Sequence, residues 1–481
     1  MTSAPPPVTL PNDFVRRLTS VSEGVSEASA DLTDAGVDWW PLAMVWRHND
    51  RHLLRAQPDV VVRPTDARQV AAVLALCAAE RVPVTAFGGR SGVCGGSIPV
   101  FGGVSLDLGD LKGIDEVDDE SLLVTVGAGT NGRAFEDDLR ESHGLTIGHW
   151  PQSIDLASVG GWVACRGAGQ YSTRYGTVAE MVEGLEVALA DGSLIRTGWN
   201  GPRSATGPDL TQLFVGSEGT LGVVTRARLR AHPVPGEQWK AAWVFPDFGS
   251  GLEVCRKVLR RGATPAVLRL YDERETRRHF GDDAGSGCAL IGLDEGDAAV
   301  IAATRQVVEE ECVAAGEARS ESLVDHWLET RNHVGGLGDA VAAGLVVDTC
   351  EIAAPWAAAR VLAESAPAAV MAIDDSLAAT VHASHHYSDG TCLYITFAGK
   401  TEDPSAWYVA VWDALMRVTL EAGGAISHHH GIGLVRGRHL EQALGPAFEV
   451  LKSLKAVLDP AGVLNPGKLG LPSPFGTPAW P

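Results

Sequence analysis

The chain has 481 residues, 45% hydrophobic and 21% charged, which is enough for two or three globular domains and excludes an intrinsically disordered protein. Its 39 basic and 60 acidic residues give a net charge of −21, which argues against binding nucleic acid and against loose docking on an anionic membrane. Eight scattered cysteines without a CxxC pair, no signal-peptide pattern and no long apolar run predict a cytoplasmic protein with reduced thiols and no transmembrane segment.

Short strands, helices and glycine-rich turns follow an N-terminal arm that we place at residues 1–54. Val60–Val62 predicts a buried strand, and the next helix repeats its apolar residues at helical spacing, with Thr65 as the expected N-cap. Further strands are predicted at 83–87, 104–108 and 123–126. The strand at 83–87 leads into the glycine-rich run 88–96, so this part of the chain is α+β with a glycine-rich turn at a strand end.

The pattern changes after Pro235, where glycine becomes rarer. Strands are predicted at 241–245, 266–271 and 288–293, and helices at 249–261 and 297–315. This order predicts an antiparallel sheet covered by helices, in a separate domain. A last helix is predicted at 446–458 and ends at Asp459-Pro460.

Three glycine-rich segments, at 88–96, 160–176 and 216–222, are candidates for holding a ligand. Glycine lets backbone N–H groups approach an anion without side chains in the way. A short glycine run alone is more often a plain tight turn, and none of the three has the spacing of the dinucleotide fingerprint or the P-loop. Together, three separated loops point to a large planar ligand with two phosphates.

The same segments resemble a known family of flavoproteins, the vanillyl-alcohol oxidase and p-cresol methylhydroxylase (PCMH) type. The similar stretches are Arg63–Pro99, Pro151–Trp162, Tyr175-Gly176 and Gly216–Gly222. The resemblance implies an α+β fold in which a PCMH-type FAD-binding domain of two α+β subdomains spans 55–235. It also implies an antiparallel-sheet cap domain flanked by helices at 236–425, and a segment at 426–481 that returns to the flavin site.

FAD is the cofactor that this resemblance implies, and we expect it to be bound non-covalently. Arg90 stands where many members carry the histidine that bonds the flavin, so we expect Arg90 near the pyrophosphate; alternatively, it points to solvent. The implied cofactor-binding residues are Phe87, Gly88, Gly89, Arg90, Ser91, Gly92, Val93, Gln152, Ser153, Ile154, Asp155, Leu156, Ala157, Ser158, Gly160, Gly161, Cys165, Arg166, Gly167, Ala168, Glu218, Gly219, Thr220, Leu221, Gly222, Val223 and Val224.

The most unusual stretch is Ser427–Gly433, with three adjacent histidines before Gly-Ile-Gly. Three readings are open: a metal site with help from His385 and His386, solvent-facing histidines without a role, and a catalytic cluster. A strand would aim only two of the three histidines to one side, which weakens the metal reading. We therefore predict no metal ligands and favour the catalytic cluster.

This stretch resembles the alkyldihydroxyacetonephosphate synthases, the FAD enzymes that form the ether bond of ether lipids. Further similar segments are Gly148–Pro151, Val244–Phe248, Ala266–Leu270 and His386–Tyr394. The resemblance implies a reaction without net redox change, in which a fatty alcohol replaces the acyl group of acyl-dihydroxyacetone phosphate. It implies catalytic roles for Tyr387, His149, His428, His429 and His430, and substrate binding by Arg269 and Arg331.

Arg269 is suited to gripping a phosphate and Tyr387 to general acid/base catalysis. From the residues alone, however, Arg269 could form a salt bridge within the cap, and Tyr387 could be a buried structural tyrosine. We expect a small-molecule or lipid-like phosphate substrate, and a homodimer is compatible with the sequence.

The FAD-dependent 2-hydroxyacid dehydrogenases, of the glycolate and D-lactate types, are the rival branch. Their cap carries a metal triad of two histidines and a glutamate. Here the second histidine position is Leu393 or Tyr394, and the glutamate position is His429, so two ligands are missing. An FAD oxidase or dehydrogenase acting on a 2-hydroxyacid or small alcohol stays as the alternative, because the acidic chain has no amphipathic membrane helix. A flavoprotein without enzymatic activity is the third class.

Overall fold

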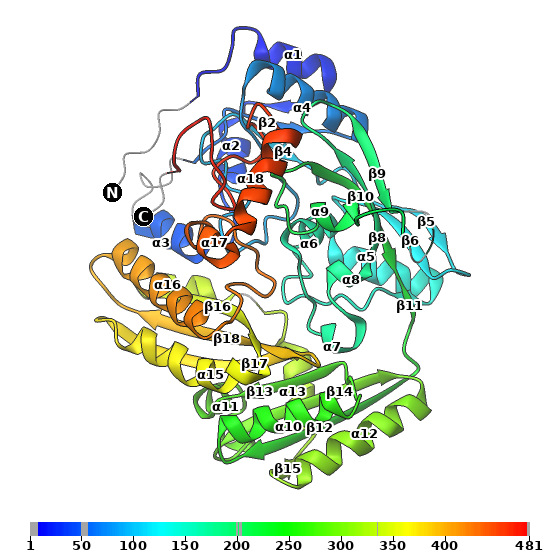
Figure 1. Cartoon of the computed structure of the whole chain (residues 1–481), viewed down its shortest axis with the longest axis vertical. Helices are drawn as coiled ribbons and strands as arrows, with labels where there is room; N and C mark the ends of the chain where they lie inside the picture. The colour runs from blue at the N-terminus through cyan, green and yellow to red at the C-terminus, as the bar shows by residue number, and fades with distance from the viewer. Residues whose placement is uncertain (1–7, 50–55, 199–200, 202–203, 334, 479–481) are drawn as a thin grey trace.

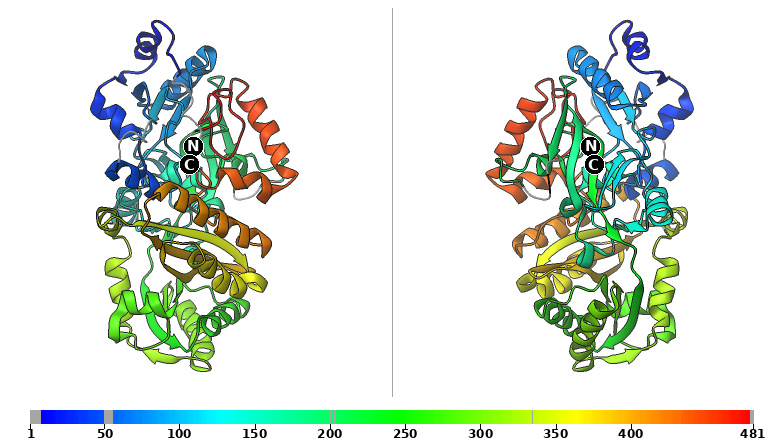
Figure 2. Two further views of the ribbon diagram at one scale, coloured as in Figure 1. Left: turned by 90° about the vertical axis from the view of Figure 1, so that its left-hand side faces the viewer. Right: turned by 90° about the vertical axis from the view of Figure 1, so that its right-hand side faces the viewer.

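Figure 1 shows a computed structural model of the chain, which describes residues 8–49, 56–198, 201, 204–333 and 335–478. Parts of the predicted N-terminal arm, residues 1–7 and 50–54, lie outside the described residues, as does residue 55 at the start of the predicted FAD-binding domain. The fold is mixed α+β, as predicted, and is built around three larger β-sheets. Two of these sheets lie in the upper part of Figure 1, and the third forms the lower part with its helices (Figures 1 and 2).

The first sheet has four strands in the order β1-β2-β4-β3, and its edge strand β3 leads into the first glycine segment. Its strands are β1 (Gly24–Ser26), β2 (Val60–Arg63), β3 (Val84–Phe87) and β4 (Val104–Asp107), with helices α1 (Phe14–Val21), α2 (Ser29–Ala35), α3 (Pro41–Asn49) and α4 (Ala67–Glu80). β2 and β3 both pair with β4 in parallel, and α4 connects β2 to β3.

The predicted N-cap of α4 is wrong by one residue. The carboxylate of Asp66, and not the hydroxyl of Thr65, accepts the backbone N–H groups of Arg68 and Gln69, at 2.8 and 2.9 Å. The Thr65 hydroxyl instead accepts a hydrogen bond from the side chain of Gln69 at 2.9 Å. Both residue types cap helices, so local pattern alone does not separate two adjacent candidates.

The second sheet is antiparallel, with the order β5-β6-β10-β8-β9. Its strands are β5 (Ile114–Asp118), β6 (Leu123–Gly127), β8 (Val182–Ala188), β9 (Leu194–Gly198) and β10 (Val223–Arg230). Around it lie α5 (Gly132–Asp138), a π-helical turn (Leu139–His143), α6 (Val159–Cys165), α7 (Ser172–Tyr175), α8 (Val178–Met181), α9 (Leu210–Phe214), and the short pair β7 (Leu145–Thr146) and β11 (His232–Pro233). The third glycine segment leads directly into the central strand β10, which fixes its position.

The third sheet has seven antiparallel strands in the order β15-β12-β14-β13-β17-β18-β16. These are β12 (Glu237–Phe245), β13 (Val267–Tyr271), β14 (Cys288–Gly296), β15 (Glu317–Arg319), β16 (Val346–Pro355), β17 (Ser376–His386) and β18 (Gly390–Gly399). The helices are α10 (Phe248–Arg260), α11 (Glu273–Phe280), α12 (Ala298–Val313), α13 (Ser322–Thr330), α14 (Gly336–Ala342), α15 (Trp356–Met371) and α16 (Pro404–Glu421). The prediction of an antiparallel sheet covered by helices is therefore confirmed.

The C-terminal segment runs back to the first two sheets through α17 (Gly437–Leu444) and α18 (Ala447–Leu458), which are red in Figure 1. Leu464 pairs with Val84 of β3. The side-chain amide of Asn465 donates to the carbonyl oxygens of Gly96 and Glu218, at 2.9 and 2.7 Å. One residue near the C-terminus thus holds the first and third glycine segments together.

Each of the eight cysteines is a free thiol, and all except Cys165 are buried. Among the described residues, none of the helices combines the length and apolar character needed to cross a bilayer.

Candidate active site

A cavity of about 620 Å³, here called the main cavity, is lined by all three glycine segments and by side chains of the seven-stranded sheet. Of the predicted cofactor-binding residues, it is lined by Phe87, Gly88, Gly89, Arg90, Ser91, Gly92, Val93, Gln152, Ser153, Leu156, Ala157, Ser158, Gly160, Gly161, Cys165, Gly167, Ala168, Glu218, Gly219, Gly222, Val223 and Val224. Segments far apart in the sequence therefore meet around one space.

Five predicted cofactor-binding residues lie outside this lining. Ile154 and Leu221 are buried in the hydrophobic core behind the loops. Asp155 forms an ion pair with Arg133, and the Thr220 hydroxyl donates to the carbonyl of Ser217. Arg166 ends α6 in a left-handed conformation (φ 55°).

The main cavity fits a large polar ligand such as FAD. A Cβ added at Gly219 would meet nothing within 4 Å, and one at Gly92 only a carboxylate oxygen at 3.8 Å, so both backbones face open space. Both ring nitrogens of His149 and the side-chain oxygens of Ser97 and Gln170 line the cavity, buried without a partner. Buried polar atoms are normally paired, so these groups fit a ligand that supplies the missing hydrogen bonds.

Arg90 lines the main cavity, but its guanidinium forms an ion pair with Asp34 at 2.6 Å. It also lies over the ring of Phe87, 5.2 Å from the centroid. The side chain is therefore fixed at the rim and does not extend freely into solvent.

The segment Ser427–Gly433 is a loop, not a strand, and two buried carboxylates hold its backbone. Glu351 accepts the N–H groups of His429 and His430, at 3.0 and 2.5 Å, and pairs with the buried Arg436. Glu218 accepts the N–H groups of Ile432 and Gly433, at 2.6 and 2.8 Å. Burial favours the neutral acid, yet Arg436 and the backbone bonds keep the pKa of Glu351 below its usual value.

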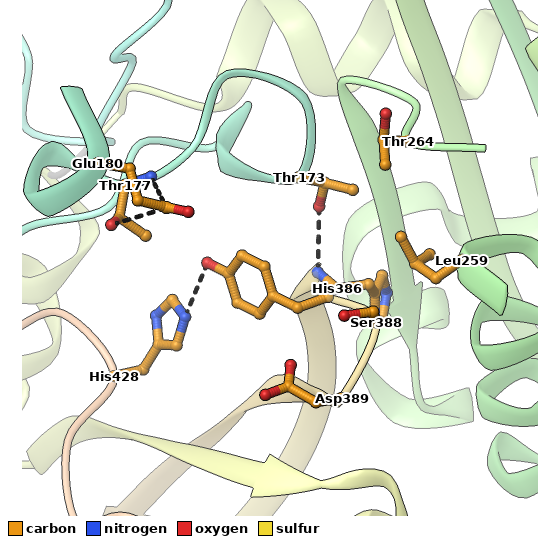
Figure 3. A pocket seen from close by; sticks show the side chains of 10 residues that line it. Thr173, Thr177, Glu180, Leu259, Thr264, His386, Ser388, Asp389 and His428 are labelled. Atoms are coloured by element: carbon orange, nitrogen blue, oxygen red, sulfur yellow. Dashed lines mark hydrogen bonds between the residues drawn. The ribbon is translucent and has the colours of Figure 1, made fainter. Parts of the chain in front are cut away.

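The predicted catalytic residues divide between two spaces. His149, His429 and His430 line the main cavity. Tyr387 and His428 line a second, outer pocket of about 450 Å³, whose other lining residues include the exposed Glu180, Ser388 and Asp389 (Figure 3). The Tyr387 hydroxyl lies 3.0 Å from Nε2 of His428, the contact dashed in Figure 3.

The cap side of the main cavity carries positive charge. Arg269 is hydrogen-bonded to His382 at 2.7 Å, and its Nε is buried without a partner. Arg278 and His279 of α11 line the same cavity. Glu275 accepts from His382 at 2.8 Å and pairs with Arg278, which fixes the orientation of both side chains. This group suits an anionic part of a substrate.

Arg331, the second predicted phosphate ligand, lines neither cavity. Its guanidinium donates to the Tyr171 hydroxyl at 2.7 Å and lies over the rings of Trp150, Tyr171 and Trp327. The structure places it in an aromatic packing position, whereas Arg278 lines the main cavity together with Arg269.

Burial keeps the histidines of the site neutral at pH 7. It lowers the pKa of His149 to about 3 and that of His428 to about 4, from an ordinary value of 6.5. Burial likewise lowers the pKa of His385 and His429 well below that value, and it raises the pKa of Tyr387 and Tyr394. Neutral imidazoles can both donate and accept hydrogen bonds.

Cys392, His428 and His429 form a group with metal-ligand side chains, whose ligand atoms lie within 4.8 Å of one another. The Nδ1 atoms of the two histidines are only 2.8 Å apart. Two nitrogen ligands of a tetrahedral zinc ion are separated by roughly 3.3 Å, given Zn–N bonds near 2.0–2.1 Å. The observed distance is that of a hydrogen bond, so this arrangement fits a metal ion poorly.

Three lining residues, His382, His385 and Tyr394, were not among the predicted catalytic or binding residues, although His385 and Tyr394 had been considered in relation to a metal site. His385 has φ +54° and lies at a β-bulge of β17, between Ser384 and His386. The bulge turns His385 toward the main cavity, while His386 lines the outer pocket. Strand alternation could have found His382 and Tyr394, which stack with ring centroids 4.4 Å apart, but not His385.

Two sequence families match the chain. The FAD binding domain family matches residues 58–198, and the C-terminal domain family of FAD linked oxidases matches residues 235–469. An uncharacterized FAD-linked oxidoreductase of Escherichia coli K12, YgcU, is 30% identical over 434 residues, covering 86% of this chain and 89% of the relative. The glycolate oxidase subunit GlcD of Bacillus subtilis is 27% identical and covers 89% of this chain and 92% of its own.

An alkyldihydroxyacetonephosphate synthase of Trypanosoma brucei brucei is 28% identical over 513 residues, covering 98% of this chain and 82% of the relative. A solved alkyldihydroxyacetonephosphate synthase matches the fold with a TM-score of 0.80 at 23% identity, over 96% of this chain and 86% of that one. p-Cresol methylhydroxylase with bound substrate matches with a TM-score of 0.76 at 17% identity, over 97% and 98% of the two chains.

Proposed function

The chain belongs to the FAD-linked oxidase family and has FAD as its cofactor, and from this premise we propose that it is an alkyldihydroxyacetonephosphate synthase-like enzyme. It exchanges the acyl group of acyl-dihydroxyacetone phosphate for a fatty alcohol. FAD is held non-covalently, with the glycine segments around it. When bound, FAD would supply a ring system that can take up an electron pair from the substrate and return it, so that no net oxidation occurs.

The observation that carries the proposal is the pairing of a cationic end with a cluster of neutral histidines in one cavity. Arg269 and Arg278 provide the charge for the substrate phosphate. The unpaired Nε of Arg269 leaves it a donor for this purpose. His429, His430 and Tyr394 lie in the same cavity, where they hold and move protons as the carboxylate leaves and the alcohol enters.

The positions of the dehydrogenase metal triad support the same choice. Tyr394 and His429 stand where that triad needs a histidine and a glutamate, and they are hydrogen-bonded to each other at 2.7 Å. Leu393, the other candidate for the histidine position, is fully buried in the core. Neither of these two positions carries the glutamate of the triad, and the nearby carboxylate of Glu351 is engaged by backbone N–H groups and Arg436, which favours a reaction that does not need a metal.

Similarity to a glycolate oxidase subunit and to D-lactate dehydrogenases keeps a second function in consideration, oxidation of a small 2-hydroxyacid. Arginine also binds a carboxylate, so the cationic end of the cavity suits that substrate class as well.

The two functions give different products. Purified holoenzyme is incubated with palmitoyl-dihydroxyacetone phosphate and hexadecanol, and the products are identified by mass spectrometry. The proposal predicts hexadecyl-dihydroxyacetone phosphate and one palmitate released per ether formed. Dye reduction by D-lactate or glycolate, without any ether product, would assign the oxidase function instead.

A further inference from the structure

Six side chains between the two cavities form a closed ring of hydrogen bonds. The members in order are Ser172, His385, Tyr394, His429, His428 and Tyr387. The successive contacts measure 2.7 Å (Ser172 Oγ to His385 Nδ1), 3.5 Å (His385 Nε2 to Tyr394), 2.7 Å (Tyr394 to His429 Nε2), 2.8 Å (His429 Nδ1 to His428 Nδ1), 3.0 Å (His428 Nε2 to Tyr387) and 3.1 Å (Tyr387 to Ser172). Both nitrogens of each histidine are used within the ring.

The number of protons matches the number of contacts. Each hydroxyl carries one proton, and each neutral imidazole carries one proton on one of its two nitrogens. Six members therefore supply six protons to six contacts, and every member both donates and accepts once. Only two arrangements of the protons give every contact one donor. Either every member donates to its next neighbour clockwise around the ring, or every member donates to its next neighbour anticlockwise.

Charge would break this balance, because a doubly protonated imidazole donates at both nitrogens and leaves two donors facing each other in the ring. The low pKa values of the three ring histidines, which arise first from burial, keep the ring neutral at pH 7. The charged groups nearest the ring act in both directions: Glu351 favours the cation at His428, while Arg269 and Arg436 disfavour it at His385 and His429.

The ring spans the partition between the two spaces. His385, Tyr394 and His429 line the main cavity, and Tyr387 and His428 line the outer pocket. Ser172, at the start of α7, is buried and closes the ring from the side of the second sheet. The ring thus has members on both sides.

We propose that this ring is a proton relay that connects the main cavity with the outer pocket. The proposal rests on the proposed function only in needing a reaction that takes up or releases a proton in the main cavity. When the Tyr394 hydroxyl gives its proton to a reacting group, Tyr394 receives one from Nε2 of His429. His429 receives one at Nδ1 from His428, His428 one at Nε2 from Tyr387, and Tyr387 one from a water molecule of the outer pocket, which leaves hydroxide that passes to the solvent.

Each O–H or N–H bond that breaks along this path is matched by one that forms, so no member keeps a charge. The transfer reverses the direction in which the hydrogen bonds between Tyr387 and Tyr394 donate. Ser172 and His385 connect the same two tyrosines on the other side of the ring, and protons that move along this second path restore the original direction. Tyr387 and His428 therefore act at a distance from the substrate, and His385, Tyr394 and His429 act next to it.

The first test follows the imidazoles directly and needs no substrate. The holoenzyme is labelled with ¹⁵N-histidine, and the ring nitrogens are observed by NMR from pH 6 to 9, with assignment from single variants. Ser172→Ala and Tyr387→Phe each open the ring; Ser388→Ala removes an exposed hydroxyl from the same outer pocket and serves as the control. The relay predicts three neutral imidazoles whose tautomer signals all change in both opened variants, including His429, which contacts neither Ser172 nor Tyr387.

The second test measures turnover and its solvent isotope effect with palmitoyl-dihydroxyacetone phosphate and hexadecanol. Tyr387→Phe removes the proton entry and is expected to lower kcat by ~100-fold with KM within about twofold, a size typical of lost acid–base catalysis. Ser172→Ala leaves one arc intact and is expected to lower kcat less, with a larger solvent isotope effect. Ser388→Ala retains the parent values.

Unchanged His429 signals in both opened variants would overturn the relay, and so would unchanged kcat in Tyr387→Phe. A stoichiometric metal ion that a chelator removes, with altered His428 and His429 signals, would also overturn it. If no ether forms with the parent enzyme, the proposed function fails, and the NMR test alone decides on the ring.

Discussion

At the scale of single residues, the carboxylate of Glu351 is the most consequential group near the site. It pairs with Arg436, and both side chains are 0% exposed. Glu351→Gln keeps the shape but leaves Arg436 buried without a counter-charge, so we expect a loss of about 3–5 kcal/mol in the free energy of unfolding. Urea denaturation measures it, with the exposed Glu364→Gln as the control. A loss below about 1 kcal/mol would contradict the assigned role.

Arg269 tests the cationic end of the main cavity. Arg269→Lys keeps the charge but loses the two-pronged donor geometry, so we expect the KM for the acyl phosphate to rise by ~10- to 100-fold, with a smaller change in kcat. Steady-state kinetics measure this effect. Arg277→Lys, on the exposed side of α11, is the matched control. Equal KM values for both variants would show that the substrate phosphate binds elsewhere.

The buried titrating groups predict how stability depends on pH. His149, His382, His386 and His428 have pKa values lowered to about 3–4, so below pH 6.5 the unfolded chain takes up protons that the folded chain does not. Asp38 and Asp348 oppose this effect. Their pKa values are raised to about 7, so between about pH 7 and 4 these two carboxyls are protonated in the folded protein but still ionised in the unfolded chain. Since four histidines outweigh two aspartates, stability falls as the pH drops from 6.5 to 4.5.

Urea denaturation at a series of pH values checks this sign. We expect the slope between pH 6.5 and 4.5 to be on the order of 2–3 kcal/mol per pH unit, since two uncompensated protons each contribute about 1.4 kcal/mol per unit. A stability that stays level or rises on acidification would mean that the buried histidines are protonated in the folded protein.

At the scale of elements, the first glycine segment is positioned by its contact with the stretch Pro151–Trp162. A Cβ on Gly89 would lie 1.9 Å from the carbonyl oxygen of Leu156. Gly89→Ala must therefore push the two segments apart, and we expect a loss of about 1–3 kcal/mol in stability together with weaker FAD retention. The ratio of flavin to protein absorbance after gel filtration reports retention. Gly236→Ala, where a Cβ meets nothing within 4 Å, should behave like the parent.

Most elements could be predicted because their patterns are local. The strand at β2 and the helices α10, α12 and α18 lie within a few residues of the ranges expected from hydrophobic periodicity and turn residues. The N-cap of α4 was misplaced because Thr65 and Asp66 are equally good caps by type, and only the hydrogen-bond geometry separates them.

The motifs of the site could be predicted from the sequence, but the relative positions of their side chains in space could not. The glycine segments and the triple histidine were visible in the sequence, yet the division of these histidines between two spaces depends on a loop held by Glu351 and Glu218. The bulge at His385 and the packing of Arg331 among three aromatic rings arise from tertiary contacts, which leave no local pattern.

At the scale of the whole molecule, the site exists only where the three sheets and the C-terminal segment meet. Asn465 links the first and third glycine segments through two carbonyl oxygens. Asn465→Ala leaves both carbonyls without this donor, so we expect the Kd for FAD to rise by ~5- to 100-fold, equivalent to about 1–3 kcal/mol. Fluorescence titration of apoprotein with FAD measures it, and the exposed Gln306→Ala is the control. Equal affinities would show that the loops are held without Asn465.

The central claim is that the bound flavin serves an exchange reaction and not a net oxidation. The most direct measurement is the anaerobic flavin spectrum of the holoenzyme after mixing with palmitoyl-dihydroxyacetone phosphate, and separately with D-lactate or glycolate. The synthase function predicts transient bleaching by the acyl phosphate alone, which hexadecanol reverses without an electron acceptor. Stable bleaching by a hydroxyacid, reversed only by an acceptor dye, would contradict it and assign the protein to the dehydrogenases.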